Sequence, residues 1–162
     1  MAENALTSGN GDPSAAGPQV VVRVAGQYIK DLSFENPNVR RLMEAPGDKP
    51  ELNVEVNVQA SQITGNVYES AVLFKATATS KMGVIYDLEL SYAGAFQIEN
   101  MPPDQLEPFL LINCPSLLFP YVRRMVSDIT REGGFPPLLL DPIDFNQLYE
   151  RRQQATKAPT VN

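Results

Sequence analysis

The chain has 162 residues, of which 43% are hydrophobic, and its 13 basic and 19 acidic side chains give a net charge of −6. This charge argues against nucleic acid and anionic membranes as main partners, because both attract a positively charged surface. With one cysteine and no histidine, the chain has no internal disulfide, no Ser-His or Cys-His catalytic pair and no histidine-containing zinc site. A single cysteine is typical of a reducing compartment, and only carboxylate-based chemistry remains open.

Both ends of the chain are predicted to be tails. Residues 1–18 are rich in Ala, Gly, Ser, Asn and Pro, so we expect a disordered N-terminal tail, and we expect a flexible C-terminal tail over residues 156–162. Residues 1–18 contain no Lys or Arg and no apolar core, which argues against a signal peptide. No apolar run approaches the roughly 18–20 residues that a membrane span requires. These patterns predict a cytoplasmic protein with a single domain over residues 19–155.

The first half of the domain is predicted to be four strands. Gln19 to Phe34 reads as a strand with a bulge or a bend at Gly26, and residues 35–50 read as a long irregular connection. Leu52 to Gln59 alternates apolar and polar side chains, as a half-buried strand does. Two further strands, separated by short turns, are predicted over residues 67–81 and 84–98. Short connections between the last three strands indicate an antiparallel sheet.

The second half is predicted to be helical. One helix is expected from Met101 to about Asn113, where Pro115 breaks it, and a second from about Ser116 to Arg131. A last helix is expected from Phe145 to about Ala155, with Asp144 as its N-cap. Strands followed by helices predict an α+β fold, with a four-stranded antiparallel sheet followed by helices packed on one side.

No motif for catalysis is present. The sequence has no glycine-rich phosphate loop, no Cys-x-x-Cys pair and no nucleophile elbow. Cys114 has no histidine to activate it and is interpreted as a buried structural thiol. The neighbouring acids Asp141 and Asp144 lie in a capping context, which favours a helix cap and a solvated turn over acid–base chemistry. We therefore expect no enzymatic activity, no metal and no cofactor.

Two sets of residues are candidates for binding. Four acids lie on strand faces that the apolar pattern leaves outward: Asp31, Glu35, Glu89 and Asp87. They form either a solvated face or an acidic docking surface for a basic partner. A second set is apolar and lies in the loop after the first strand and on the last helix: Val39, Leu42, Met43, Phe145, Leu148 and Tyr149. These side chains form either core and oligomer contacts or an exposed groove for extended apolar polypeptide.

Three segments resemble the SecB-type protein-export chaperones. They are residues 28–38 (YIKDLSFENPN), 114–123 (CPSLLFPYVR) and 134–145 (GFPPLLLDPIDF). They occur in the family's order and at plausible spacing, and the resemblance covers about residues 20–153. It implies an α+β fold assembled as a homotetramer, a dimer of dimers. It also implies an ATP-independent chaperone that binds unfolded preproteins and delivers them to the SecA motor ATPase.

The resemblance assigns roles to particular positions. Asp31, Glu35 and Glu89 match the acidic residues that receive the basic, zinc-bearing tail of SecA, and Leu88 is assigned to the subunit interface. The loop after the first strand and the last helix match the client groove, for which our candidates are Leu42, Met43, Val54, Val56, Phe145, Leu148 and Tyr149. The chain departs from relatives at Asp48 and Arg152, where they carry aromatic residues, so a thinner aromatic lining is expected.

Two alternatives from other classes remain open at this point. A carrier of small apolar ligands would use the same apolar surface, and a monomer with an enclosed pocket would favour it. A carboxylate-dependent hydrolase would need acids that face inward, and the sequence places few acids on its apolar faces.

Overall fold

The computed structural model describes residues 16–45 and 48–158. Along the chain, four strands are followed by helices, with one short helix between the first two strands. This order confirms the predicted α+β class. Most of the predicted N-terminal tail (1–15) and the end of the predicted C-terminal tail (159–162) lie outside the described residues.

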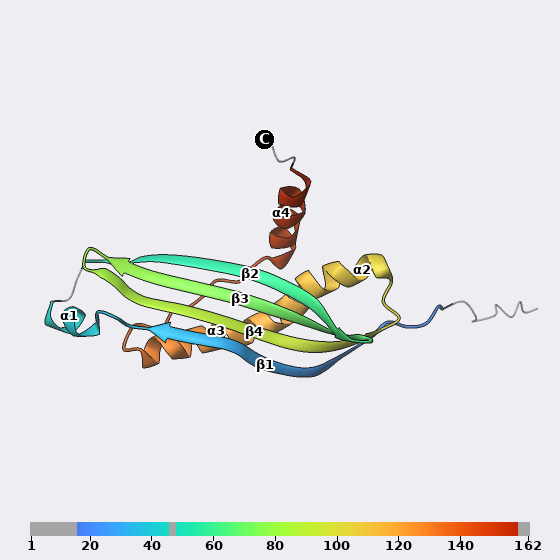
Figure 1. The fold of residues 1–162 in the computed structure, drawn as a ribbon, viewed down its shortest axis with the longest axis horizontal. Helices are drawn as coiled ribbons and strands as arrows, with labels where there is room; N and C mark the ends of the chain where they lie inside the picture. Colours follow the sequence, from blue (N-terminus) through green and yellow to red (C-terminus); the bar gives the residue numbers. More distant parts are fainter. Residues whose placement is uncertain (1–15, 46–47, 159–162) are drawn as a thin grey trace, which may run out of the picture.

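The sheet is built from four long antiparallel strands, β1 (Val21–Glu35), β2 (Glu51–Thr64), β3 (Val67–Ser80) and β4 (Gly83–Glu99). Their order across the sheet is β1-β4-β3-β2, so β1 and β2 form opposite edges. The connection between them therefore passes the ends of β4 and β3, and it contains the short helix α1 (Val39–Glu44), which lies at one end of the sheet (Figure 1).

The two faces of the sheet differ in chemistry because side chains alternate along each strand. On β4, Tyr86, Leu88 and Leu90 are buried beneath the helices, whereas Asp87 and Glu89 point to the other face. β3 repeats the pattern opposite them, and the bulge predicted at Gly26 of β1 is confirmed by a register shift between Val24 and Gly26. The sequence did not indicate the second shift, between Ile29 and Asp31. One face is therefore core, and the other faces away from the helices.

The helical half differs from the prediction in one respect. α2 (Pro103–Pro108), the π-helix η1 (Phe109–Asn113) and α3 (Cys114–Glu132) follow one another without a gap, so the prediction that Pro115 breaks the helix was wrong. Proline lacks an N–H and disrupts a regular α-helix. The wide turn of η1 changes the hydrogen-bond register just before Pro115, which then lies in the first turn of α3, where its missing donor is tolerated.

A segment without regular structure (residues 133–144, named here the strap) joins α3 to α4 (Phe145–Lys157). Gly134 has a φ of 87° and turns the chain at the end of α3. The predicted N-cap is confirmed, since the Asp144 carboxylate accepts a hydrogen bond from the backbone N–H of Gln147 at 3.1 Å. α3 lies along one face of the sheet, and α4 stands away from it (Figure 1).

Candidate binding surfaces

The outward face of the sheet carries a row of charged side chains. Strand register places Glu55 of β2 opposite Lys75 of β3, and Lys75 opposite Glu89 of β4. Asp31 of β1 pairs with Ser91, the next outward-facing position of β4. We name five of the outward-facing carboxylates on these strands the acidic face: Asp31, Glu35, Glu55, Asp87 and Glu89.

A shallow hollow of about 320 Å³ lies in this face, and Asp31, Glu55, Lys75 and Glu89 line it. The Lys75 Nζ lies 2.8 Å from the Glu89 Oε1. This hydrogen-bonded pairing with Glu89 raises the pKa of Lys75, and the charges of Asp87 and Glu55 add to the effect. Lys75 is therefore a cation held among several carboxylates, and an incoming basic group would compete with it.

Glu35 lies beside the hollow rather than in it. Its register partner across β1 and β4 is Asp87, so two carboxylates face each other on the same side of the sheet. Asp87 accepts a hydrogen bond from the Thr77 hydroxyl at 2.7 Å. Like charges placed directly opposite destabilise a sheet, so folding alone gives no reason for this pair. The structure thus brings Asp31 and Glu89 to one hollow and leaves Glu35 next to it.

A polar network that the sequence did not indicate ties β1 to β3 on the same face. The Tyr28 hydroxyl donates to the Glu69 Oε2 at 2.5 Å, and the Lys30 ammonium lies 2.6 Å from the Glu69 Oε1. The bond to Glu69 raises the pKa of Tyr28 to about 12. Lys30 and Tyr28 together lower the pKa of Glu69. These contacts span the intervening strand β4 and fix the position of β1, on which Asp31 lies.

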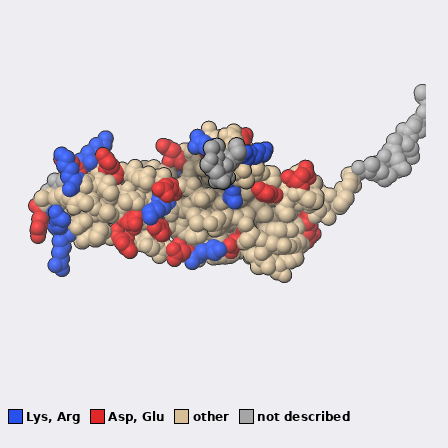
Figure 2. Space-filling model, turned by 45° about the horizontal axis from the view of Figure 1, so that its top comes forward, with Lys and Arg blue, Asp and Glu red and all other residues tan. Residues whose placement is uncertain are grey.

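Charge is unevenly distributed over the molecule. In Figure 2, acidic side chains occur along the whole length of the visible surface, whereas basic ones gather mainly at the end that carries α1 and around α4.

An apolar hollow of about 660 Å³ lies at the α1 end, on the helix side of the sheet. Leu42 and Met43 of α1 form one wall, and Phe135 and Pro136 of the strap form another. Tyr86 of β4 lines it between these walls, with its ring centroid 5.1 Å from that of Phe135 and 5.8 Å from that of Phe34. Met43 is 80% exposed. The hollow is therefore an open, mainly apolar site rather than an enclosed cavity.

The other predicted groove residues are spread over a longer surface. Val54 is exposed and Val56 half-buried on the helix side of β2. Leu148 and Tyr149 of α4 line a small pocket of about 30 Å³ with Val58. These residues do not form one continuous cavity with Leu42 and Met43.

Phe145 and Leu88 lie elsewhere than expected. Phe145 is 2% exposed and packs edge-on against Phe119, with ring centroids 5.8 Å apart, so it belongs to the core and not to a groove. Leu88 is 0% exposed beneath the helices. A side chain with no exposed surface cannot contact a second chain in this conformation, which corrects its assignment to a subunit interface.

Arg152 and Asp48, which stand where relatives carry aromatic residues, both form polar contacts. The Arg152 Nη1 donates to the Val58 carbonyl of the edge strand β2 at 3.0 Å. Asp48 lines the apolar hollow and forms an ion pair with Lys81 at 3.2 Å. Tyr86 and Phe135 supply aromatic lining that we did not predict, although the segment 134–145 had been singled out as a motif. The alternation of β4 places Tyr86 on the helix side, but it does not indicate that a hollow opens there.

The described residues offer neither a metal site nor a membrane-spanning helix. No group of three or more His, Cys, Asp or Glu side chains in residues 16–45 and 48–158 could hold a metal ion. Among the helices of those residues, none is long and apolar enough to cross a membrane.

The family model and the relatives that match this chain all indicate the same family. The family model for the preprotein translocase subunit SecB matches residues 15–156. The protein-export protein SecB of Cereibacter sphaeroides is 45% identical over 161 residues, covering 94% of this chain and 97% of the relative. The protein of the same name from Bradyrhizobium diazoefficiens is 40% identical over 153 residues, covering 94% and 95%. The protein from Afipia carboxidovorans is 46% identical over 145 residues, covering 90% and 88%.

A solved structure shares the fold at low sequence identity. It is the SecB-like chaperone of Mycobacterium tuberculosis, solved in complex with a peptide from the HigA1 antitoxin. The TM-score is 0.59 at 15% identity, and the match covers 75% of this chain and 89% of that one.

Proposed function

The chain belongs to the SecB family, and from that premise we propose that it is an ATP-independent chaperone that holds unfolded precursor proteins before export. In this proposal it acts in the cytoplasm, where it binds precursors before their translocation. It then passes them to the SecA motor ATPase. It does no covalent chemistry. In this proposal the protein binds an unfolded client on one side of the sheet and SecA on the other.

The observation that carries the proposal is the apolar hollow at the α1 end. It is open and bordered by aromatic and Met side chains, and the exposed Met43 is flexible enough to adapt to different occupants. Unfolded chains expose apolar side chains that folded proteins bury. A site that binds such side chains therefore selects non-native proteins and does not require a particular sequence.

The energy available at one such site is modest. Burying a single Leu or Phe side chain contributes about 1.5–3 kcal/mol, which alone gives weak binding. Other apolar side chains on the helix side, such as Val54 on β2 and Leu148 on α4, provide further points of contact. One long client that engages several sites gains avidity without specificity. The exposed edge of β2 offers backbone pairing as well, except at the Val58 carbonyl, which Arg152 already occupies.

We assign the acidic face to SecA. Asp31, Glu35 and Glu89 face away from the helices, whereas the apolar hollow opens on the helix side. A basic segment can therefore dock while a client remains bound, and the motor is brought to its substrate without nucleotide hydrolysis by the chaperone. Complementary charge mainly accelerates encounter and fixes orientation.

Separate variants of the two faces test this proposal. Glu89→Lys, or Asp31→Ala, should weaken SecA binding by about tenfold or more at low salt and leave binding of an unfolded client within about twofold. Leu42→Ser combined with Met43→Ser should do the reverse, because both side chains line the hollow. Met43 is 80% exposed, whereas Leu42 also packs against the core, so a melting curve must show that this variant is folded. Titrations of each variant with both partners give the four affinities. If a variant of either face lost affinity for SecA and for the unfolded client to the same extent, the separation of the two sites would be rejected.

One observation favours the second candidate, a carrier of small apolar ligands. The apolar hollow, at about 660 Å³, has the size of a small-molecule site. A carrier would bind a small apolar dye in this hollow and would not lose the dye when an unfolded protein is added. Displacement of the dye by the unfolded protein favours the chaperone.

A further inference from the structure

The strap supplies one wall of the apolar hollow but has few backbone bonds of its own. Its residues Phe135 and Pro136 line the hollow. The N–H groups of Gly133, Gly134 and Phe135 bond back to carbonyls of α3 and end the helix. Pro136 and Pro137 then follow, and proline has no N–H to donate. Leu138 is the next residue that can anchor the wall through its backbone N–H.

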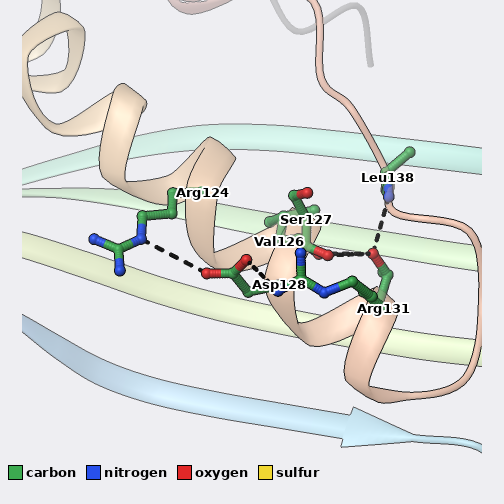
Figure 3. Close-up of polar contacts among 7 residues, drawn as sticks. Arg124, Val126, Ser127, Asp128, Arg131 and Leu138 are labelled. Carbon is green, nitrogen blue, oxygen red and sulfur yellow. Dashed lines mark hydrogen bonds and ion pairs between the residues drawn. The ribbon is translucent and has the colours of Figure 1, made fainter.

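A buried hydroxyl of α3 takes that donor. The Leu138 backbone N–H donates to the Thr130 Oγ1 at 2.9 Å. The same hydroxyl donates to the Val126 carbonyl at 2.8 Å, with the Ser127 carbonyl at 3.2 Å (Figure 3). Figure 3 shows Leu138 reaching back toward the last turns of α3. The hydroxyl thus both donates and accepts.

The position of this hydroxyl is unusual for a residue with only a packing role. Thr130 is 0% exposed, and a valine has the same branched shape without the cost of burying a hydroxyl. A buried hydroxyl is costly unless it is bonded. Its bond to the helix carbonyl is common for threonine in helices, but its bond to Leu138 joins two elements.

The other end of the wall is held by a second side chain. The Asn36 amide, which follows β1, donates to the Gly133 carbonyl at 3.1 Å. Phe135 and Pro136 therefore stand between two anchored points, Gly133 and Leu138. Their distance from Tyr86 and from α1 depends on those anchors.

We propose that Thr130 is a positioning residue for client binding, because its hydroxyl holds the strap so that Phe135 and Pro136 keep the apolar hollow open at a fixed width. The proposal rests on the function proposed for that hollow. Thr130 does not contact the client and acts through the strap.

Two substitutions at Thr130 separate the hydroxyl from the packing. Thr130→Val keeps the branched shape and removes the acceptor, so the Leu138 amide should exchange its hydrogen about tenfold faster or more. Loss of one net hydrogen bond corresponds to about a fivefold change in equilibrium, and the affinity for an unfolded client should fall by about that factor. Thr130→Ser keeps the hydroxyl and should leave both measurements within about twofold of the wild type, even though loss of its methyl group lowers the melting temperature.

The matched control is Ser116→Ala. The Ser116 hydroxyl makes the same kind of bond within the helical region, to the Ile112 carbonyl at 2.5 Å, but within the described residues it makes no bond to the strap. This variant should change neither Leu138 exchange nor client affinity. The client is a fluorescently labelled protein, reduced and carboxymethylated so that it cannot refold. Thr130→Cys, which has a similar size and a much weaker acceptor, replaces the Val variant if that one folds poorly.

Faster exchange at Leu138 with unchanged client affinity would overturn the proposal, and so would equal losses of affinity in the Val and Ser variants. In both cases the wild-type protein still binds the client, so the proposed function stands. If the wild-type protein does not bind the unfolded client, the proposed function fails first, and the role of Thr130 fails with it.

Discussion

At the residue scale, Lys75 is the cation that lies among the carboxylates of the acidic face. It lies opposite both Glu55 and Glu89, and its ion pair with Glu89 is solvent-exposed. An exposed pair of this kind is weak and easily exchanged. In the proposed docking, Lys75 is an internal counter-ion that a basic segment of SecA must displace or share.

Replacing this cation should tighten docking. We expect Lys75→Gln to raise the affinity for SecA by about three- to tenfold at low salt, because Glu89 is then unpaired and the face gains negative charge. The gain should shrink as salt is added, because salt screens exposed charges. A binding titration at two salt concentrations measures both effects.

The control for this prediction is Lys81→Gln. Lys81 pairs with Asp48 at 3.2 Å and does not line the hollow of the acidic face, so this variant should change SecA affinity less. Weaker SecA binding by Lys75→Gln would show that Lys75 supports the docking surface instead of competing for it.

Cys114 gives a second prediction at this scale. Burial raises the pKa of the Cys114 thiol to about 12 from its ordinary 9.0. Because the folded-state pKa is raised, the thiolate is scarce in the folded protein at pH 8 and more abundant in the unfolded one. A thiol reagent should react at least about 100-fold more slowly with the folded protein than with the protein in denaturant. Equally fast reaction in both states would contradict the burial of this side chain.

Some residue roles could be predicted from the sequence, and others could not. Alternation along the strands placed Asp31 and Glu89 outward, and the position of Asp144 before an apolar helix indicated its cap. Alternation also put Leu88 on the same face as Leu90, but its interface role came from the family resemblance and not from the pattern. Whether an apolar helix residue such as Phe145 faces a core or a groove depends on tertiary packing.

At the scale of elements, α3 lies very close to β4 at Gly94. A methyl group at Gly94 would lie 3.0 Å from the Leu118 Cδ2 and 2.8 Å from the Phe96 ring. Leu118 is itself fully buried. Glycine is used here because nothing larger fits between the helix and the strand.

A methyl group at this contact should therefore cost stability. We expect Gly94→Ala to lower the free energy of unfolding by about 1–3 kcal/mol, through overpacking against Phe96 and Leu118. The matched control is Gly26→Ala, since a Cβ at Gly26 meets nothing within 4 Å, and it should change stability by no more than about 0.5 kcal/mol. Denaturant unfolding measures both. A neutral result for Gly94→Ala would mean that the Phe96 ring and Leu118 can make room for the methyl group without cost.

The elements themselves were largely predictable. The strands and α4 have a strong periodicity and clear end signals, and the structure places them within a few residues of the prediction, although β2 continues to Thr64. The continuous passage from α2 through η1 into α3 was missed because single-sequence patterns treat Pro115 as a stop. A π-turn has no sequence signal that distinguishes it from a helix end.

At the scale of the whole molecule, β1 is a long edge strand with many exposed apolar residues. Val22, Val24, Ile29 and Leu32 are each more than a third exposed in the single chain, and the outer edge of β1 has no strand partner in the described sheet. An apolar edge of this length invites pairing with another chain. It supports the expectation that several copies assemble.

Native mass spectrometry tests this expectation. We predict four chains per particle near neutral pH, as a dimer of dimers. Leu32→Lys, on the exposed part of β1, should lower the number of chains without unfolding the protein, because it places a charge on the apolar edge. A single chain at micromolar concentration would contradict the assembly and would favour the carrier alternative.

The measurement that tests the central claim most directly is a titration of the purified protein, without nucleotide, against one exported precursor in its unfolded and folded forms. The account predicts tight binding of the unfolded precursor and at least about 100-fold weaker binding of the folded form, since only the unfolded chain can place apolar side chains in several sites at once. Similar affinities for the two forms, or no binding of either, would contradict the holding-chaperone function.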